Sequence, residues 1–152
     1  MNAFELLKKD HRKVEEIFAQ LEPTTERAQK TREELFTKLK QELDIHAHIE
    51  ETILYPVLKQ QAETREVTFE GYEEHAVVKD LLKELATTPV DTEEWTAKLK
   101  VLKENVEHHV EEEEGEMFPS AEEALSKDEI NAIGERLDAE KKAQQRSLTA
   151  GA

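Results

Sequence analysis

The sequence predicts an all-α protein, an up-down-up-down four-helix bundle with a short fifth helix at its C-terminal end. Composition is one reason, because 38% of the 152 residues are charged, 5% are aromatic, and there are only four Gly and four Pro. Apolar residues also recur at steps of three and four, as helices with one buried face require. We expect one domain at 1–142 and a flexible tail at 143–152.

An internal repeat is the third reason, and it relates residues 1–58 to residues 66–120. Each half has an isolated His and, about 35 residues later, a His-x-x-x-Glu pair followed by an aromatic residue and Pro. The two longer motifs read HAHIEETILYP at 46–56 and HVEEEEGEMFP at 109–119. The repeat therefore predicts two helical hairpins that face each other.

The first hairpin begins with a helix from Asn2 to Leu21. Asn2 can cap this helix, with Glu5 at the capping-box position. His11 falls on its apolar stripe and is expected to point inward. The stripe holds Phe4, Leu7, Val14, Phe18 and Leu21.

A second helix should start at Thr24 or Thr25 and run to about Tyr55, where Pro56 either ends or kinks it. Two polar residues interrupt its apolar seam. The seam reads Leu35, Leu39, Leu43, His46, Glu50, Ile53 and Val57.

The second hairpin follows a polar connection at 59–68. Its first helix is expected from Thr68 to Leu85, with His75 on the apolar seam, and its second is capped by Asp91 with Glu94 in a capping box. The last seam holds Trp95, Leu99, Leu102, Val106, His109, Glu113 and Met117.

A fifth helix is expected at 126–142, packed across the bundle. Ser126 and Glu129 form a capping box at its start. Its apolar face carries Ile130, Ile133 and Leu137.

Charge and cysteine content exclude several classes of function. The net charge of −15 argues against binding to nucleic acid or to anionic membranes. The absence of Cys excludes a disulfide scaffold, a zinc finger and a thiolate-bound iron–sulfur cluster. No apolar run approaches the length of a membrane span, and the N-terminal residues lack a signal-peptide core. We expect a cytoplasmic protein, as a monomer or weak homodimer.

In a bundle of this topology the four seams face one axis, so four imidazoles and two carboxylates should converge. Buried ionised carboxylates are costly without a partner, and a pair of cations would relieve that cost. Nitrogen and oxygen ligands without thiolate suit iron or manganese. We rank two irons first, two manganese second and zinc third, with two His on each metal and both Glu bridging. The predicted ligands are His11, His46, Glu50, His75, His109 and Glu113.

The alternative is that these residues are ordinary core histidines and ion pairs, as a single His-x-x-x-Glu often is. Two such pairs in register with two further inward His favour a metal site. His48 lies near the opposite side of its helix from His46. His108 could pair with Glu112, but the spacing to Pro119, matched against Pro56, favours His109 and Glu113 as the ligand pair.

These motifs resemble those of the hemerythrin-like HHE cation-binding family, especially small stand-alone bacterial members such as mycobacterial hemerythrin-like proteins. The resemblance covers roughly residues 1–120 and implies a non-haem di-iron centre bridged by oxo or hydroxo and two carboxylates. Ferritin-like proteins, with Glu-x-x-His motifs, match less well. The resemblance rests on Asp10-His11, His46-x-x-x-Glu50 with Tyr55-Pro56, Glu74-His75, and His109-x-x-x-Glu113 with Phe118-Pro119.

The chain departs from oxygen-carrying hemerythrins at one position. They place an additional His one turn before the residue that matches His75, where this chain has Gly71; the corresponding residue before His11 is Leu7. The difference argues against reversible oxygen carriage and leaves a coordination position open. Candidates to fill it are Glu73, Glu74, Tyr55, Tyr72 and solvent.

Three functions follow. The first is an enzyme that disproportionates hydrogen peroxide, as catalase does, or reduces nitric oxide, in defence against oxidative stress. Tyr55 would then act as a proton or hydrogen-bond donor, although a packing role fits its position equally well. The second is a non-enzymatic module that binds or senses O2 or iron. The third is a structural bundle with degenerate ligands. The partner is a small ligand such as O2, H2O2 or NO.

Overall fold

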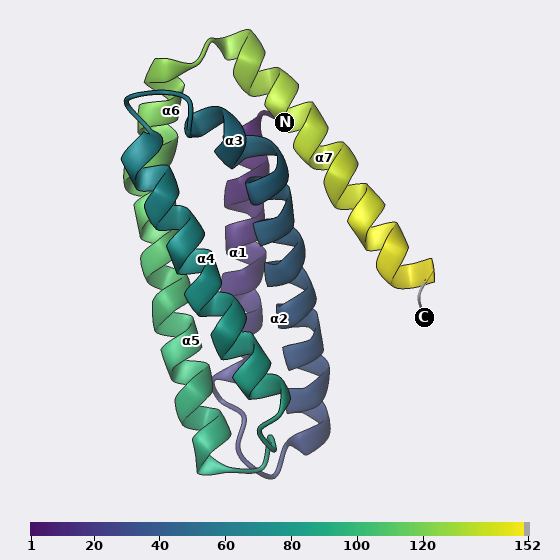
Figure 1. Ribbon diagram of the computed structural model, residues 1–152. Coiled ribbons are helices and arrows are strands. Elements are labelled where there is room, and N and C mark those ends of the chain that lie inside the picture. Colours follow the sequence, from purple (N-terminus) through teal and green to yellow (C-terminus); the bar gives the residue numbers. More distant parts are fainter. Residues whose placement is uncertain (151–152) are drawn as a thin grey trace.

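The computed structural model describes residues 1–150, and in that range the chain forms helices and turns without a strand. Figure 1 shows four long helices side by side, with the chain running alternately up and down, as predicted. Within a hairpin, α1 packs along α2 and α4 packs along α5. No helix in residues 1–150 is long and apolar enough to cross a bilayer. The four helices are α1 (Ala3–Leu21), α2 (Gln29–Ile49), α4 (Arg65–Ala86) and α5 (Glu93–Glu112).

Two of the three predicted helix caps are confirmed. Asn2 Oδ1 accepts a hydrogen bond of 2.9 Å from the backbone N–H of Glu5. Ser126 and Glu129 each receive a bond from the other's backbone N–H, which closes the capping box.

The cap predicted at Asp91 is wrong by one residue. The residue that caps α5 is Thr92, whose hydroxyl accepts from the N–H of Trp95 at 3.2 Å. The carboxylate of Asp91 instead accepts a hydrogen bond of 3.2 Å from the side-chain amide of Gln29, the first residue of α2.

The start of α2 also lies later than predicted, at Gln29. Thr24 closes a turn instead, because its N–H and its hydroxyl both donate to the carbonyl of Leu21. The buried guanidinium of Arg32 donates to the carbonyls of Thr24 and Val90, at 2.9 and 2.6 Å. Because Thr24 and Val90 lie in the two loops at this end of the bundle, Arg32 joins these loops.

The two helices that carry the His-x-x-x-Glu pairs, α2 and α5, each continue through a π turn that the sequence did not predict. These turns are η1 (Glu50–Leu54) and η2 (Glu113–Met117), followed by α3 (Tyr55–Leu58) and α6 (Phe118–Ala124). The N–H that closes each turn reaches back five residues, to the carbonyl of Glu50 or Glu113. Pro56 and Pro119 explain this, because a proline ring clashes with the carbonyl four residues earlier in an α-helix and a wider turn relieves the clash.

The last helix, α7 (Lys127–Ala150), packs against α1, α2 and η1, but it is not short. It runs eight residues past its predicted end at 142, because Ala, Gln and Arg favour helix there and Gln144 bonds to Glu140. Figure 1 shows its end pointing away from the bundle. That residues 143–150 are flexible stays a prediction, and 151–152 lie outside the described residues.

Buried apolar side chains form two separate clusters, one toward each end of the bundle. Leu7, Leu54 and Phe118 belong to the first, and Phe18 and Trp95 belong to the second. A layer of buried polar residues lies between them. This layer contains all six predicted metal ligands.

Candidate metal centre

The six predicted ligands converge, and each is at most 6% exposed. They fall into two sets of four whose candidate ligand atoms lie within 4.8 Å of one another. Both sets contain Glu50 and Glu113, as two bridging carboxylates would. The first set adds His11 and His46, and the second adds His75 and His109.

The ε nitrogens of all four imidazoles face the two carboxylates. Each carboxylate approaches one His from its own helix and another from the opposite hairpin. Glu50 Oε1 lies 3.2 Å from His46 and 3.0 Å from His75. Glu113 lies 3.2 Å from His109 through Oε2 and 3.0 Å from His11 through Oε1. The two hairpins are thereby joined by polar contacts in the middle of the bundle.

Hydrogen bonding among these groups is incomplete, which tests whether they fit a metal. His46 Nε2 and Glu50 Oε2 are buried without a hydrogen-bond partner. His75 Nε2 and His109 Nε2 lie 3.1 Å apart and aim at each other. Buried polar atoms are normally satisfied, so atoms that aim at one region without bonding need a cation or a proton between them. The donor set of imidazole and carboxylate fits a pair of divalent metals.

Each imidazole is held from behind by a further carboxylate on its Nδ1. Such partners orient a metal-binding His and fix its tautomer. Each of these four carboxylates is adjacent in sequence to a predicted ligand, and each half of the repeat supplies two of them. The pairs are His11–Glu114 at 2.6 Å, His46–Asp10 at 3.1 Å, His75–Glu51 at 2.8 Å and His109–Glu74 at 2.5 Å.

Three of these four carboxylates meet a cationic side chain in turn. Asp10 pairs with Lys141 at 2.5 Å, Glu51 with Lys79 at 3.1 Å, and Glu114 with Arg12. Glu74 instead lies 3.3 Å from His108, beside the carboxyl of Glu112. The nearby carboxylates of Glu74 and Glu70 raise the pKa of Glu112 to about 8.

Burial and charge act in opposite directions on the central groups. Burial alone would lower the pKa of His46, but the carboxylates of Glu50 and its neighbours hold that pKa well above its usual value. The pKa of His109 is raised in the same way by Glu113. Burial would raise the pKa of Glu113, yet the imidazole of His109 holds it well below the usual range. Without metal, these shifts favour protons on His46 and His109 that balance the charge of the carboxylates.

Tyr55 is the aromatic residue that reaches the centre. Its hydroxyl donates to Glu113 Oε2 at 2.6 Å and lies 3.4 and 3.5 Å from the ε nitrogens of His75 and His109. Tyr55 follows Glu50 by five residues, which in an α-helix would turn it away by about 140°. The π turn brings it back to the face of Glu50. Burial and the two carboxylates raise its pKa well above the usual value, so the hydroxyl keeps its proton.

Gly71 provides the space for that hydroxyl. A Cβ at position 71 would lie 2.8 Å from the oxygen of Tyr55 and 3.2 Å from Cε of Met117. Tyr55 thus occupies the region beside the residue where oxygen carriers place an additional His. Tyr72 makes an edge-to-face contact with the Tyr55 ring, with centroids 5.1 Å apart and ring planes at 73°, and Glu73 is exposed.

The two halves differ at this point. Phe118 takes the place of Tyr55 in the second repeat, and its ring stacks on His11 at 6.1 Å. Leu7 takes the place of Gly71. The hydroxyl therefore contacts both shared glutamates, but the imidazoles beside it are those of His75 and His109.

We expect Gly71→Ala to displace Tyr55, because the new methyl group would overlap its hydroxyl. Overpacking of this kind costs about 1–3 kcal/mol in the free energy of unfolding. Chemical denaturation and the near-ultraviolet circular dichroism of the tyrosine would measure both effects. Gly115→Ala is the matched control, since nothing lies within 4 Å of its added Cβ. Equal stability of the two variants would contradict the assigned contact.

A cavity of about 30 Å³ adjoins all four imidazoles. Apolar side chains form most of the rest of its lining, and its size admits only a molecule of a few atoms. Its apolar lining includes Val14, Leu43, Val78, Leu82, Val106 and Val110.

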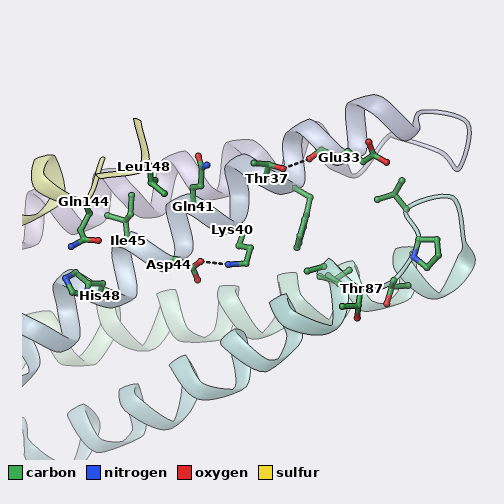
Figure 2. A pocket seen from close by; sticks show the side chains of 16 residues that line it. Glu33, Thr37, Lys40, Gln41, Asp44, Ile45, His48, Thr87, Gln144 and Leu148 are labelled. Atoms are coloured by element: carbon green, nitrogen blue, oxygen red, sulfur yellow. Dashed lines mark hydrogen bonds and ion pairs between the residues drawn. The ribbon is translucent and has the colours of Figure 1, made fainter. Parts of the chain in front are cut away.

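The two remaining histidines, His48 and His108, lie away from the centre, as predicted. His48 bonds to Glu140 of α7 at 2.9 Å, and His108 is 70% exposed. Figure 2 shows His48 at one end of a surface hollow of about 860 Å³ that extends along α2 toward Thr87. None of the six predicted ligands lines this hollow.

The structure is a four-helix bundle whose middle layer holds a buried cluster of His and Glu that could hold metal ions. The profile of the hemerythrin HHE cation-binding domain matches residues 2–121. The chain belongs to this family, and the resemblance inferred from the motifs is confirmed.

A crystal structure of a similar protein supports the same assignment. It is the hemerythrin HHE cation binding domain-containing protein of Mycobacterium kansasii, a homolog of Rv2633c, with 28% sequence identity and a TM-score of 0.86. The match covers 99% of this chain and 91% of that one. The fold is therefore that of an HHE domain.

Two further protein sequences are also similar to this chain. The uncharacterized protein Rv2633c of Mycobacterium tuberculosis is 28% identical over 140 residues, which are 91% of this chain and 84% of that protein. A DNA nickase of Nostoc is 29% identical over 150 residues, or 96% of this chain. This chain spans only 41% of the length of the nickase.

Proposed function

We propose that the chain holds two iron ions in the buried cluster and reacts there with a small oxidant. Hydrogen peroxide disproportionation or nitric oxide reduction is the favoured activity. One ion would take His11 and His46, and the other His75 and His109, with both glutamates shared. The observation that carries this proposal is the set of buried ligand atoms that face one another without complete hydrogen bonding.

The bound metals would supply Lewis acidity and electrons, and the chain supplies the rest. Carboxylates behind the imidazoles orient the ε nitrogens toward the centre. Apolar cores on both sides exclude water. Tyr55 holds a proton within 3.5 Å of two ligand nitrogens, where it can donate a hydrogen bond to a small molecule in that half. The cavity of about 30 Å³ supports a substrate of two to four atoms.

Non-enzymatic binding of O2 or iron is the alternative function. A carrier would form a stable, reversible adduct with O2, whereas an enzyme evolves O2 from peroxide, or consumes nitric oxide, over many turnovers. The departure at Gly71 and the proton on Tyr55 favour the enzyme. DNA nicking is not proposed, because the net charge of −15 opposes binding to phosphates and the nickase has much additional length.

Elemental analysis of protein from iron-supplemented cells, together with its optical spectrum, tests the proposal. We expect about two irons per chain and oxo-to-iron charge-transfer bands in the near ultraviolet. Assays of O2 evolution from peroxide, and of nitric oxide consumption with an added electron donor because that reduction consumes electrons, would then separate the two activities. Negligible metal in a fully folded protein would overturn the proposal in favour of a structural bundle.

Replacement of Tyr55 by Phe should leave the iron content unchanged and lower the turnover rate about 100-fold, as expected for loss of a positioned proton donor. The rate would be measured with the substrate identified above. Tyr72→Phe is the control, because Tyr72 contacts the ring of Tyr55 without a bond to the centre. Turnover by Tyr55→Phe at the normal rate would mean that Tyr55 serves packing alone.

A further inference from the structure

A second cluster of His and carboxylates lies on the surface formed by α4 and α5. His108 Nε2 lies 3.3 Å from Glu74 Oε2 and 3.2 Å from Glu112 Oε2. The candidate ligand atoms of the three residues lie within 4.8 Å of one another. His108 is 70% exposed, so solvent ions reach this cluster directly, unlike the buried centre.

The charge around this cluster is unbalanced. Among the four carboxylates that hold the buried imidazoles, Glu74 is the one without a Lys or Arg partner in residues 1–150. It faces a hollow of about 480 Å³. No Lys or Arg is among the residues that line this hollow, which are Glu66, Phe69, Glu70, Glu73, Glu74, His108 and Glu112. Three of the four His–carboxylate pairs thus have a Lys or Arg next to the carboxylate, and the fourth pair, His109–Glu74, has an anionic hollow there.

We propose that Glu74, His108 and Glu112 form an outer site for one divalent cation, and that this site passes the ion to the buried pair. One imidazole and two carboxylates suit Fe²⁺, Mn²⁺ or Zn²⁺. The loading role rests on the proposed function, whereas binding of the outer ion does not.

Glu74 connects the two sites. Its Oε2 faces His108, while its Oε1 lies 2.5 Å from Nδ1 of the buried His109. A single imidazole therefore separates the outer cluster from the centre. The other three carboxylates, Asp10, Glu51 and Glu114, each lie beside a positive charge that repels a cation approaching from solvent. These charges belong to Lys141, Lys79 and Arg12. The net charge of −15 raises the local cation concentration further.

Binding of the outer ion is tested by adding Mn²⁺ to the purified holoprotein and measuring free Mn²⁺ by electron paramagnetic resonance. We expect one additional Mn²⁺ per chain. His108→Ala and Glu112→Gln should each weaken it at least about 10-fold, as loss of a ligand does. His48→Ala and Glu111→Gln are matched controls that remove the same groups elsewhere. An absent additional ion, or unchanged binding by His108→Ala, would overturn the outer site.

Loading is tested by adding Fe²⁺ anaerobically to metal-free protein and following the rate at which the buried centre fills. His108→Ala should fill about 10-fold more slowly and reach the same final iron content as the wild type. Equal filling rates would overturn the loading role. If the wild type holds no iron at all, the proposed function fails, and the Mn²⁺ count still decides whether the outer ion binds.

Discussion

Glu113→Ala should empty both halves of the centre and destabilise the bundle at the same time. Glu113 is fully buried, belongs to both sets of ligands, and contacts His11, His109 and Tyr55. Without it, the protonated imidazoles of the metal-free protein lose a counter-charge. Removal of one partner from a buried ion pair costs about 3–5 kcal/mol, which lowers Tm by roughly 6–20 °C in a chain of this size.

A comparison with two other variants separates metal loss from unfolding. His11→Ala removes a ligand of one set only, so we expect it to retain about one metal per chain. Glu111→Ala removes an exposed carboxylate two residues from Glu113 and should change stability by less than about 0.5 kcal/mol. Elemental analysis and thermal denaturation of the three variants measure both effects. Normal iron content in Glu113→Ala would contradict the ligand assignment.

The sequence predicted the bundle and the convergence of its polar seams because both depend on helical periodicity. His11 and His75 each fall on an apolar stripe, and each His-x-x-x-Glu pair shares a helix face. Matched spacing in two halves then required the four seams to meet. The structure brings these residues together, while their binding of metal stays a prediction.

Tyr55 was predicted from the sequence as a candidate donor at the site, but α-helical periodicity places it off the face of Glu50 and so did not show how its hydroxyl reaches the centre. The signal was present in Pro56 and Pro119, which occupy matching positions and force a π turn after each glutamate. A proline that was expected to end or kink the helix instead widens one turn of it. The hydroxyl then enters the space that Gly71 leaves.

The role of the carboxylates that bond to the Nδ1 atoms was missed for a different reason, although Asp10 and Glu74 were named in the family motifs and Glu74 as a candidate ligand. Asp10, Glu51, Glu74 and Glu114 lie in a chain with 36 acidic residues, so composition does not distinguish them. Their adjacency to the predicted ligands in both halves was the usable signal. The C-terminal end of α7 was misjudged because it depends on local helix propensity and on polar pairs within the helix such as Gln144–Glu140, which have no apolar periodicity.

Metal binding should release protons and strengthen steeply with pH. The pKa values of His46, His75 and His109 are raised in the metal-free chain, although burial alone would lower them, because the surrounding carboxylates outweigh burial. A metal needs neutral imidazoles, so it must displace these protons. Each displaced proton makes the affinity rise about 10-fold per pH unit, and three make it rise about 1,000-fold.

The stability of the metal-free protein should change in the opposite sense. A His whose pKa is raised by folding stabilises the protein fully below its unfolded pKa of about 6.5, and that contribution is lost as pH rises through the folded pKa. The difference in Tm between metal-loaded and metal-free protein should therefore widen from pH 6 to pH 8. Titration calorimetry of metal binding in buffers of different ionisation enthalpy counts the protons released. His48→Ala is the control and should release as many protons as the wild type. Metal uptake at pH 7 without proton release would show that the imidazoles are already neutral, and that the buried carboxylates are neutralised in another way.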